Sequence, residues 1–219
     1  MTARRKFQHR SALRTSGRSF DRSLGQRSAR KSVLIICEDQ KNAPQYFRAL
    51  CHHLKINSAT VQIPPNAGSA PISVVDFAEE KYHRDGGYDH VFCVFDKDQH
   101  ESYRRAIQKV NGLISRTQEP MPILAVTAVP CFELWILLHF ERTDRPMRTC
   151  AEVVKKIKQH VPGYMKGESD ITNELLTRTK QAVANARWLI KQQAAAGTDN
   201  PSTRIHEIVS TLIGLANSQ

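Results

Sequence analysis

The sequence lacks the patterns that mark a membrane-spanning protein, a secreted protein or an ATPase. No apolar run approaches the roughly 18–20 residues that a membrane helix needs, and the most apolar stretch, residues 132–140, contains Glu133 and His139. The N-terminus has no apolar segment of the kind found in secretory signals. No G-x-x-x-x-G-K-[ST] loop occurs, so we do not expect this chain to hydrolyse ATP. The sequence therefore predicts a cytoplasmic protein without a membrane anchor.

Cysteines are few, and their spacing is typical of neither a zinc site nor a disulfide framework. The five are odd in number and include no C-x-x-C pair. Two of them fall in apolar runs that predict buried strands. We therefore expect reduced thiols in the core of a protein from a reducing compartment. The cysteines are Cys37, Cys51, Cys93, Cys131 and Cys150.

Acidic residues are scarce at the start of the chain. The 219 residues carry a formal charge of +11, but residues 1–31 hold ten Lys and Arg against one acid, so the remainder is close to neutral. This Arg- and Ser-rich segment has too few apolar residues to fold, and we expect a disordered basic tail. Its arginines suit contacts with nucleic-acid phosphates; a solubilising tail and a mitochondrial transit peptide are the alternatives. The candidate contacts are Arg4, Arg5, Arg10 and Arg14.

Residues 32–219 are predicted to form an α/β domain whose later part, from about residue 131, is helical. Apolar runs that predict buried strands alternate with segments of helical periodicity, which favours βαβ units and a parallel sheet. No internal repeat is visible. The predicted strands are 33–37, 59–63, 90–95 and 123–129, and the predicted helices are 44–54, 72–82, 102–116, 131–140, 151–160, 175–193 and 202–215.

Acidic residues follow two of the most apolar predicted strands. Glu38 comes directly after the first strand, and Asp96 and Asp98 follow the third. Ligands of open parallel sheets bind outside the carboxyl ends of the strands, and carboxylates there suit Mg²⁺ or Mn²⁺ with a phosphate substrate. Two of the acids would hold one ion, and Glu38 would hold a second ion or act as a general base in phosphoryl transfer or phosphodiester hydrolysis. Solvated loop acids are the alternative.

Haloacid-dehalogenase-like phosphatases also use a D-x-D motif at a strand end. They place it after their first strand, whereas the first predicted strand here ends in Glu38. The order of the acids therefore speaks against that class.

Several segments resemble motifs of the RloB family. Residues 37–47 (CEDQKNAPQYF) are similar to its opening motif, residues 95–98 (FDKD) to its strand end, and residues 130–140 (PCFELWILLHF) to its most specific segment. Tyr164, Lys166 and residues 200–203 match two shorter motifs. The order of Glu38 and the later D-x-D also resembles the TOPRIM catalytic domain. The resemblance extends over about residues 32–215, and the chain is identified as an RloB-like protein.

The resemblance implies a Rossmann-like TOPRIM sheet flanked by helices and a metal-dependent nuclease of phage defence. It implies an AAA- or ABC-type ATPase as partner. DNA and RNA, including tRNA, are both left open as substrates, and so is a homo-oligomer. Glu38, Asp96 and Asp98 would then bind Mg²⁺ or Mn²⁺ with support from Glu133, and Lys166 would engage the scissile phosphate. Lys41 and Lys97 are further candidate nucleic-acid contacts.

The chain departs from the family pattern after Glu38. Asp39 and Gln40 stand where the family has Gly and another acid, and residues 128–129 (AV) replace Ser-Asn. Asp39 adds a side chain where Gly allows close backbone approach to phosphate, although it is also a candidate to replace the missing acid next to the metal. A degenerate domain that binds nucleic acid or an ATPase without catalysis is therefore a second hypothesis. A basic RNA- or ribosome-associated protein, suggested by charge alone, is the third.

Individual candidates have structural alternatives. Glu133 is either a site residue or an acid that stabilises the first turn of a helix. His139 is either a second-shell acid or base or a hydrogen-bonded core histidine. Lys166 binds phosphate or is merely solvated. Residues 200–203 are predicted to cap the last helix.

Overall fold

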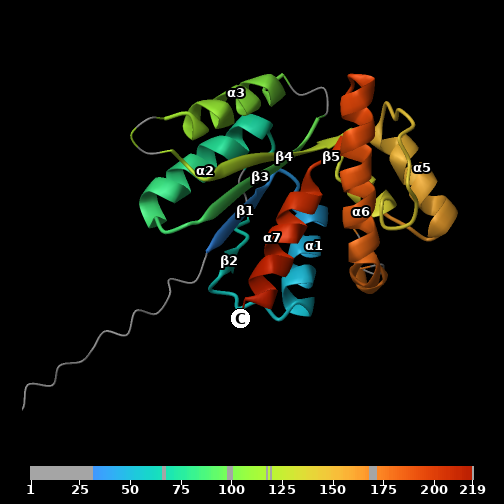
Figure 1. Cartoon of the computed structure of the whole chain (residues 1–219), viewed down its shortest axis with the longest axis horizontal. Helices are drawn as coiled ribbons and strands as arrows, with labels where there is room; N and C mark the ends of the chain where they lie inside the picture. The colour runs from blue at the N-terminus through green and yellow to red at the C-terminus, as the bar shows by residue number, and fades with distance from the viewer. Residues whose placement is uncertain are drawn as a thin grey trace, which may run out of the picture.

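The computed structural model describes residues 32–65, 68–97, 101–116, 118, 120–167 and 172–218 (Figure 1). The predicted basic tail, with Arg4, Arg5, Arg10 and Arg14, lies outside the described residues, as does Asp98. The division of the chain into a tail and one α/β domain therefore remains a prediction.

A five-stranded sheet with the order β2-β1-β3-β4-β5 forms the centre of the molecule. Strands β2, β1, β3 and β4 run parallel to one another, and β5 runs antiparallel to β4. This confirms the predicted α/β class with a mostly parallel sheet. The strands are β1 (Val33–Cys37), β2 (Val61–Gln62), β3 (His90–Asp96), β4 (Ile123–Val129) and β5 (Ser202–Thr203).

Strand β5 corrects the prediction that residues 200–203 only cap the last helix. Ser202 pairs with Val129 and Thr203 with Ala128. The side chain of Asn200 accepts a hydrogen bond from Met147 N at 3.1 Å, whereas Thr203 Oγ1 accepts one from Ile205 N at 3.3 Å, so the predicted cap of the last helix is made by Thr203 and not by Asn200. The pairing was missed because it depends on β4, which lies some seventy residues earlier in the chain.

The sheet is covered on both faces, because alternate residues of each strand point to opposite sides. In β1, Leu34 and Ile36 pack in a core with α2 (Pro71–Asp85) and α3 (Tyr103–Ile114), which lie together above the sheet in Figure 1. Val33, Ile35 and Cys37 pack in a larger core on the other face. Both faces are buried, which explains the continuous apolar runs of β1 and β3.

The larger core contains the other five helices, and the predicted helical character of the later part of the chain is confirmed. Trp135 and Phe47 are its largest fully buried side chains. Among the described residues, no helix is long and apolar enough to cross a membrane. These helices are α1 (Asn42–His53), α4 (Glu133–Leu137), α5 (Cys150–His160), α6 (Thr172–Ala196) and α7 (Ile205–Asn217).

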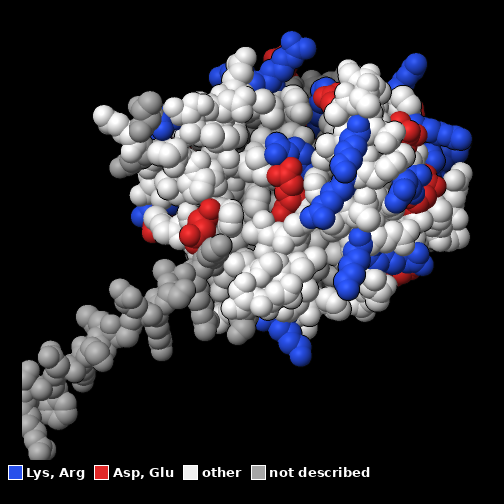
Figure 2. Space-filling view, in the orientation of Figure 1, with Lys and Arg blue, Asp and Glu red and all other residues white. Residues whose placement is uncertain are grey.

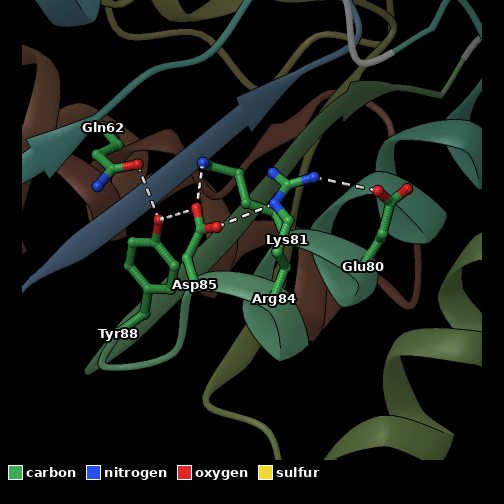
Figure 3. A network of polar contacts seen from close by, with 6 residues as sticks. All are labelled: Gln62, Glu80, Lys81, Arg84, Asp85 and Tyr88. Carbon is green, nitrogen blue, oxygen red and sulfur yellow. Dashed lines mark hydrogen bonds and ion pairs between the residues drawn. The ribbon is translucent and has the colours of Figure 1, made fainter.

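A polar network ties the end of α2 to the edge strand β2 (Figure 3). Tyr88 Oη donates a hydrogen bond to Gln62 Oε1 at 2.8 Å, and Asp85 pairs with Lys81 at 2.5 Å and with Arg84 at 3.0 Å. Hydrogen bonds from these two cations lower the pKa of Asp85 to about 2. Tyr88 precedes β3, so this network lies at the amino end of that strand and not at the end where the candidate acids follow.

Candidate functional site

The carboxyl ends of β1 and β3 bring Glu38 and Asp96 together. The two strands pair in parallel register up to Cys37 and Val94, and the Glu38 amide continues the ladder by donating to Val94 O at 2.9 Å. The Asp96 amide in turn donates to Glu38 Oε2 at 3.3 Å. The two acids that the sequence places 58 positions apart are thus neighbours at one edge of the sheet.

Asp96 lies near three other acids, and Lys166 is the nearby cation that offsets their negative charge. Its pKa is raised well above the ordinary value, first by burial and then by the negative charge of Glu133, with smaller contributions from Glu38 and Asp39. Lys166 acts in the opposite direction. A cation bound at this point would relieve the repulsion and hold the carboxyl in its ionised form.

Glu133 is fully buried in the first turn of α4 and is held from three sides. Asn42 Nδ2 donates a hydrogen bond to its Oε1 at 2.8 Å, and Lys166 Nζ lies 3.3 Å from the same oxygen. Cys150 Sγ lies 2.9 Å from Oε2. Glu133 is thus an acid in the first turn of a helix, as one of the two interpretations has it, and it pairs with Lys166. Its contribution to a metal site stays a prediction.

Cys131 and Cys150 form a disulfide, with their Cα atoms 5.7 Å apart. The expectation of reduced thiols is wrong for these two cysteines, whereas Cys37, Cys51 and Cys93 are free. The pair escaped the sequence analysis because no motif marks it: it forms where the residues before α4 meet the start of α5. A disulfide sulfur carries no hydrogen, so Cys150 donates to Glu133 only in the dithiol form.

Lys166 reaches Glu133 from the loop after α5. The following residue, Gly167, has φ +87°, and its position lies against the side chains of Lys41 and Asn42 at the start of α1. Residues that carry a side chain rarely adopt a positive φ of this size, which explains why a glycine stands where the loop passes α1. The Lys166 side chain is 55% exposed, so one side of its ammonium group faces solvent while the other faces Glu133.

Asp39 fastens the beginning of α1. Its carboxylate accepts hydrogen bonds from the amides of Lys41 at 2.9 Å and Ala43 at 3.0 Å, groups that a helix leaves unsatisfied at its N-terminus. The departure from the family's glycine thus has a structural use, because it orders the turn that carries Asn42 toward Glu133.

His139 and Lys97 have partners of other kinds. His139 is fully buried, its Nδ1 donates to Trp135 O at 2.8 Å, and its Nε2 lies 3.4 Å from Tyr46 Oη. Burial lowers the pKa of His139 to about 4, so its ring is neutral near pH 7. Lys97 pairs with Asp199 and lies 6.0 Å from the Tyr103 ring.

A small cavity of about 20 Å³ lies beside Asn42, with Tyr46, Ile136 and Tyr164 in its wall. Such a volume holds no more than about one water molecule.

The donor set fits a hard divalent cation. Carboxylate oxygens of Glu38 and Asp96 would hold it, with waters and a substrate phosphate completing the shell, as Mg²⁺ prefers. Glu133 does not join them in a tight group: in the described part of the chain, the group of three ligand atoms within 4.8 Å of one another is formed by Cys131, Glu133 and Cys150. The sequence analysis missed Asn42 and Cys150, whose places depend on the packing of α1 and α5 against α4.

Fold and site together define an α/β domain with carboxylates gathered at the carboxyl edge of a mostly parallel sheet. The family model described as RloB-like protein matches residues 33–212. The chain therefore belongs to the RloB-like family, which confirms the resemblance of its motifs. No curated protein and no solved structure gives a significant match.

Proposed function

We propose that this protein is a TOPRIM-type nuclease that hydrolyses phosphodiester bonds with Mg²⁺ or Mn²⁺. The observation that carries the proposal is the meeting of Glu38 and Asp96 at the carboxyl edge of the sheet, within the electrostatic reach of Glu133 and Lys166. Acids at this edge with a partly exposed lysine beside them are the groups that metal-assisted phosphodiester hydrolysis requires.

Each residue has a defined part in this proposal. Glu38 and Asp96 hold the cation, together with Asp98, which lies outside the described residues. A divalent ion held by these carboxylates would supply Lewis-acid polarisation of the phosphate and an activated water. Lys166 offers its exposed side to a phosphate oxygen, and Glu133 with Asn42 positions that lysine.

Basic side chains of the described residues supply a surface for a nucleic-acid backbone. On the face drawn in Figure 2, Lys and Arg gather on the side formed by α5 and α6 (compare Figure 1). Exposed lysines on these two helices are Lys155, Lys158, Lys180 and Lys191. Contacts of this kind to phosphates give binding that weakens with salt and carries no base specificity.

The family resemblance supplies the biological setting of the proposal. It suggests a cytoplasmic effector of phage defence that acts on DNA or RNA, with an AAA- or ABC-type ATPase as partner.

Substitution of Asp96 by Asn tests the nuclease directly. Divalent-dependent cleavage of labelled DNA and RNA should disappear, because the amide cannot hold the cation as the carboxylate does. Asp76→Asn is the matched control: Asp76 is an exposed acid on α2, pairs with Lys109 and belongs to the helices on the other face of the sheet from Glu133, and its loss should leave cleavage unchanged. Undiminished cleavage by the Asp96 variant would refute the assignment.

A non-catalytic binding subunit is the second candidate function. It is favoured by Asp39, which stands where the family has glycine and uses its carboxylate to fasten α1. Calorimetry separates the two functions: a nuclease should bind Mg²⁺ in a way that Asp96→Asn abolishes, whereas a binding subunit should retain nucleic acid or ATPase binding without any such metal dependence.

A further inference from the structure

Two sulfur atoms and one carboxylate meet beside α4, next to the acids described above but with different chemistry. The Sγ atoms of Cys131 and Cys150 and one oxygen of Glu133 all lie within 4.8 Å of one another. Cys131 precedes α4, Glu133 begins it, and Cys150 is the first residue of α5. We propose that in the reduced protein these three side chains bind Zn²⁺, with the fourth coordination position open.

The backbone already places the ligands at a suitable separation. Tetrahedral zinc, with Zn–S of about 2.3 Å and Zn–O of about 2.1 Å, needs ligand atoms roughly 3.6–3.8 Å apart. Glu133 Oε2 lies 2.9 Å from Cys150 Sγ, and the two cysteine Cα atoms are 5.7 Å apart. Rotation of the two freed thiols about their side-chain bonds opens the gap for the ion without movement of α4 or α5.

The surrounding charges suit this ligand set. Two thiolates and a carboxylate carry three negative charges against two on the ion, and the ammonium of Lys166 balances the remainder. Its Nζ lies 3.3 Å from Glu133 Oε1 and 4.0 Å from Cys150 Sγ. Asn42 donates to Oε1 at 2.8 Å, which leaves Oε2 turned toward the sulfurs. Such hydrogen-bonded partners of a ligand orient it and raise metal affinity.

Oxidation state decides whether the site exists. In the disulfide form neither sulfur is a thiolate, and the ion has no soft ligand. A dithiol reductant supplies two electrons and two protons to the S–S bond and becomes a disulfide itself; a phosphine supplies the two electrons and becomes its oxide, and water supplies the two protons and the oxygen. Either reaction gives two thiols. Zinc then displaces these two protons as it binds. The site shares Glu133 and Lys166 with the proposed nuclease, but its thiolate ligands take no part in phosphodiester hydrolysis, so zinc binding and cleavage can be tested separately.

Cobalt substitution gives a direct readout of sulfur coordination. The full-length protein is reduced, stripped of metal with a chelator and titrated with Co²⁺ without oxygen. We expect a thiolate-to-cobalt charge-transfer band in the near ultraviolet that saturates at one equivalent and disappears when Zn²⁺ is added. Protein oxidised with diamide should give no band, and re-reduction should restore it.

Variants assign the ligands. The double variant Cys131→Ser/Cys150→Ser should lose the band, and Glu133→Gln should weaken Co²⁺ binding while the band remains. Cys51→Ser is the matched control, because Cys51 is a half-buried free thiol on α1, and it should behave as the wild type. If circular dichroism shows that the double variant is unfolded, Cys150→Ser alone must weaken the band.

Two results would overturn the proposal: reduced wild-type protein without a band at saturating Co²⁺, or a full band in the folded double variant. Asp96→Asn separates this outcome from that of the nuclease, since it should lose cleavage and keep the cobalt band.

Discussion

Reduction of the Cys131–Cys150 disulfide should lower the thermal midpoint of the protein by about 4–8 °C when metal is absent. The bond closes a loop over a sequence separation of 19. A loop of this size restricts the unfolded chain enough to contribute about 3 kcal/mol to the free energy of unfolding. The reduced Cys150 regains a thiol that donates to Glu133 Oε2, which returns about 1 kcal/mol. The net loss of about 2 kcal/mol converts to the stated shift for a protein of this length.

The measurement compares urea and thermal unfolding with and without a phosphine reductant, with a chelator present so that zinc binding does not stabilise the reduced form. The variant Cys131→Ser/Cys150→Ser should unfold near the reduced wild type and should not respond to reductant. Cys51→Ser, which leaves the disulfide intact, should respond as the wild type does. Equal midpoints for oxidised and reduced wild-type protein would refute the reasoning.

Three further predictions concern buried polar groups. Burial lowers the pKa of His139 from 6.5 to about 4. The free energy of unfolding should therefore be highest above pH 6.5 and fall by about 3 kcal/mol toward pH 4, because the unfolded chain takes up the proton first. His139→Gln should flatten this decline in urea midpoints measured across that range. The pKa of Asp96 is raised instead, so ionisation of this carboxyl destabilises the fold as the pH rises. Asp96→Asn should therefore be more stable than wild type at neutral pH without divalent ions. A gain in stability that persists below pH 3.8 would contradict this cause. Asn185→Ala should cost about 1–3 kcal/mol in chemical denaturation, since Asn185 Nδ2 satisfies the buried Leu138 carbonyl at 2.8 Å, whereas Gln181→Ala on the exposed side of α6 should cost little.

The elements that the sequence predicted well are those whose signal is local. Continuous apolar runs placed β1 at residues 33–37 and β4 at residues 123–129, exactly the bounds observed, because both strands are buried on both faces. Strand β2 is only Val61–Gln62, shorter than the predicted 59–63, since these two residues alone pair with β1. Strand β5 has two residues and no apolar run of its own, so only its partner β4 defines it.

The candidate site was predictable to the extent that topology determines it. The rule that parallel strands present ligands at their carboxyl ends was sufficient to pair Glu38 with Asp96. Asn42 and Cys150 were not predictable, because each reaches Glu133 from a helix that packs against α4 without any fixed spacing in the chain. Residues such as these, which contact a site residue from a neighbouring helix, are placed by the packing of helices, and no local pattern in a single sequence marks them.

The pairing of β4 with β5 has a consequence for how the molecule is assembled. Residues 128 and 203 stand side by side in the sheet, so the strand that precedes Cys131 and Glu133 receives its last neighbour only when the region before α7 has arrived. Contacts between residues so distant in sequence form late, because a long loop must close first. The pairing of β1 with β3 joins Val33 to His90 across a shorter stretch of chain than the one between Ala128 and Thr203. We therefore expect β5 to join β4 after β1 and β3 have brought Glu38 and Asp96 together.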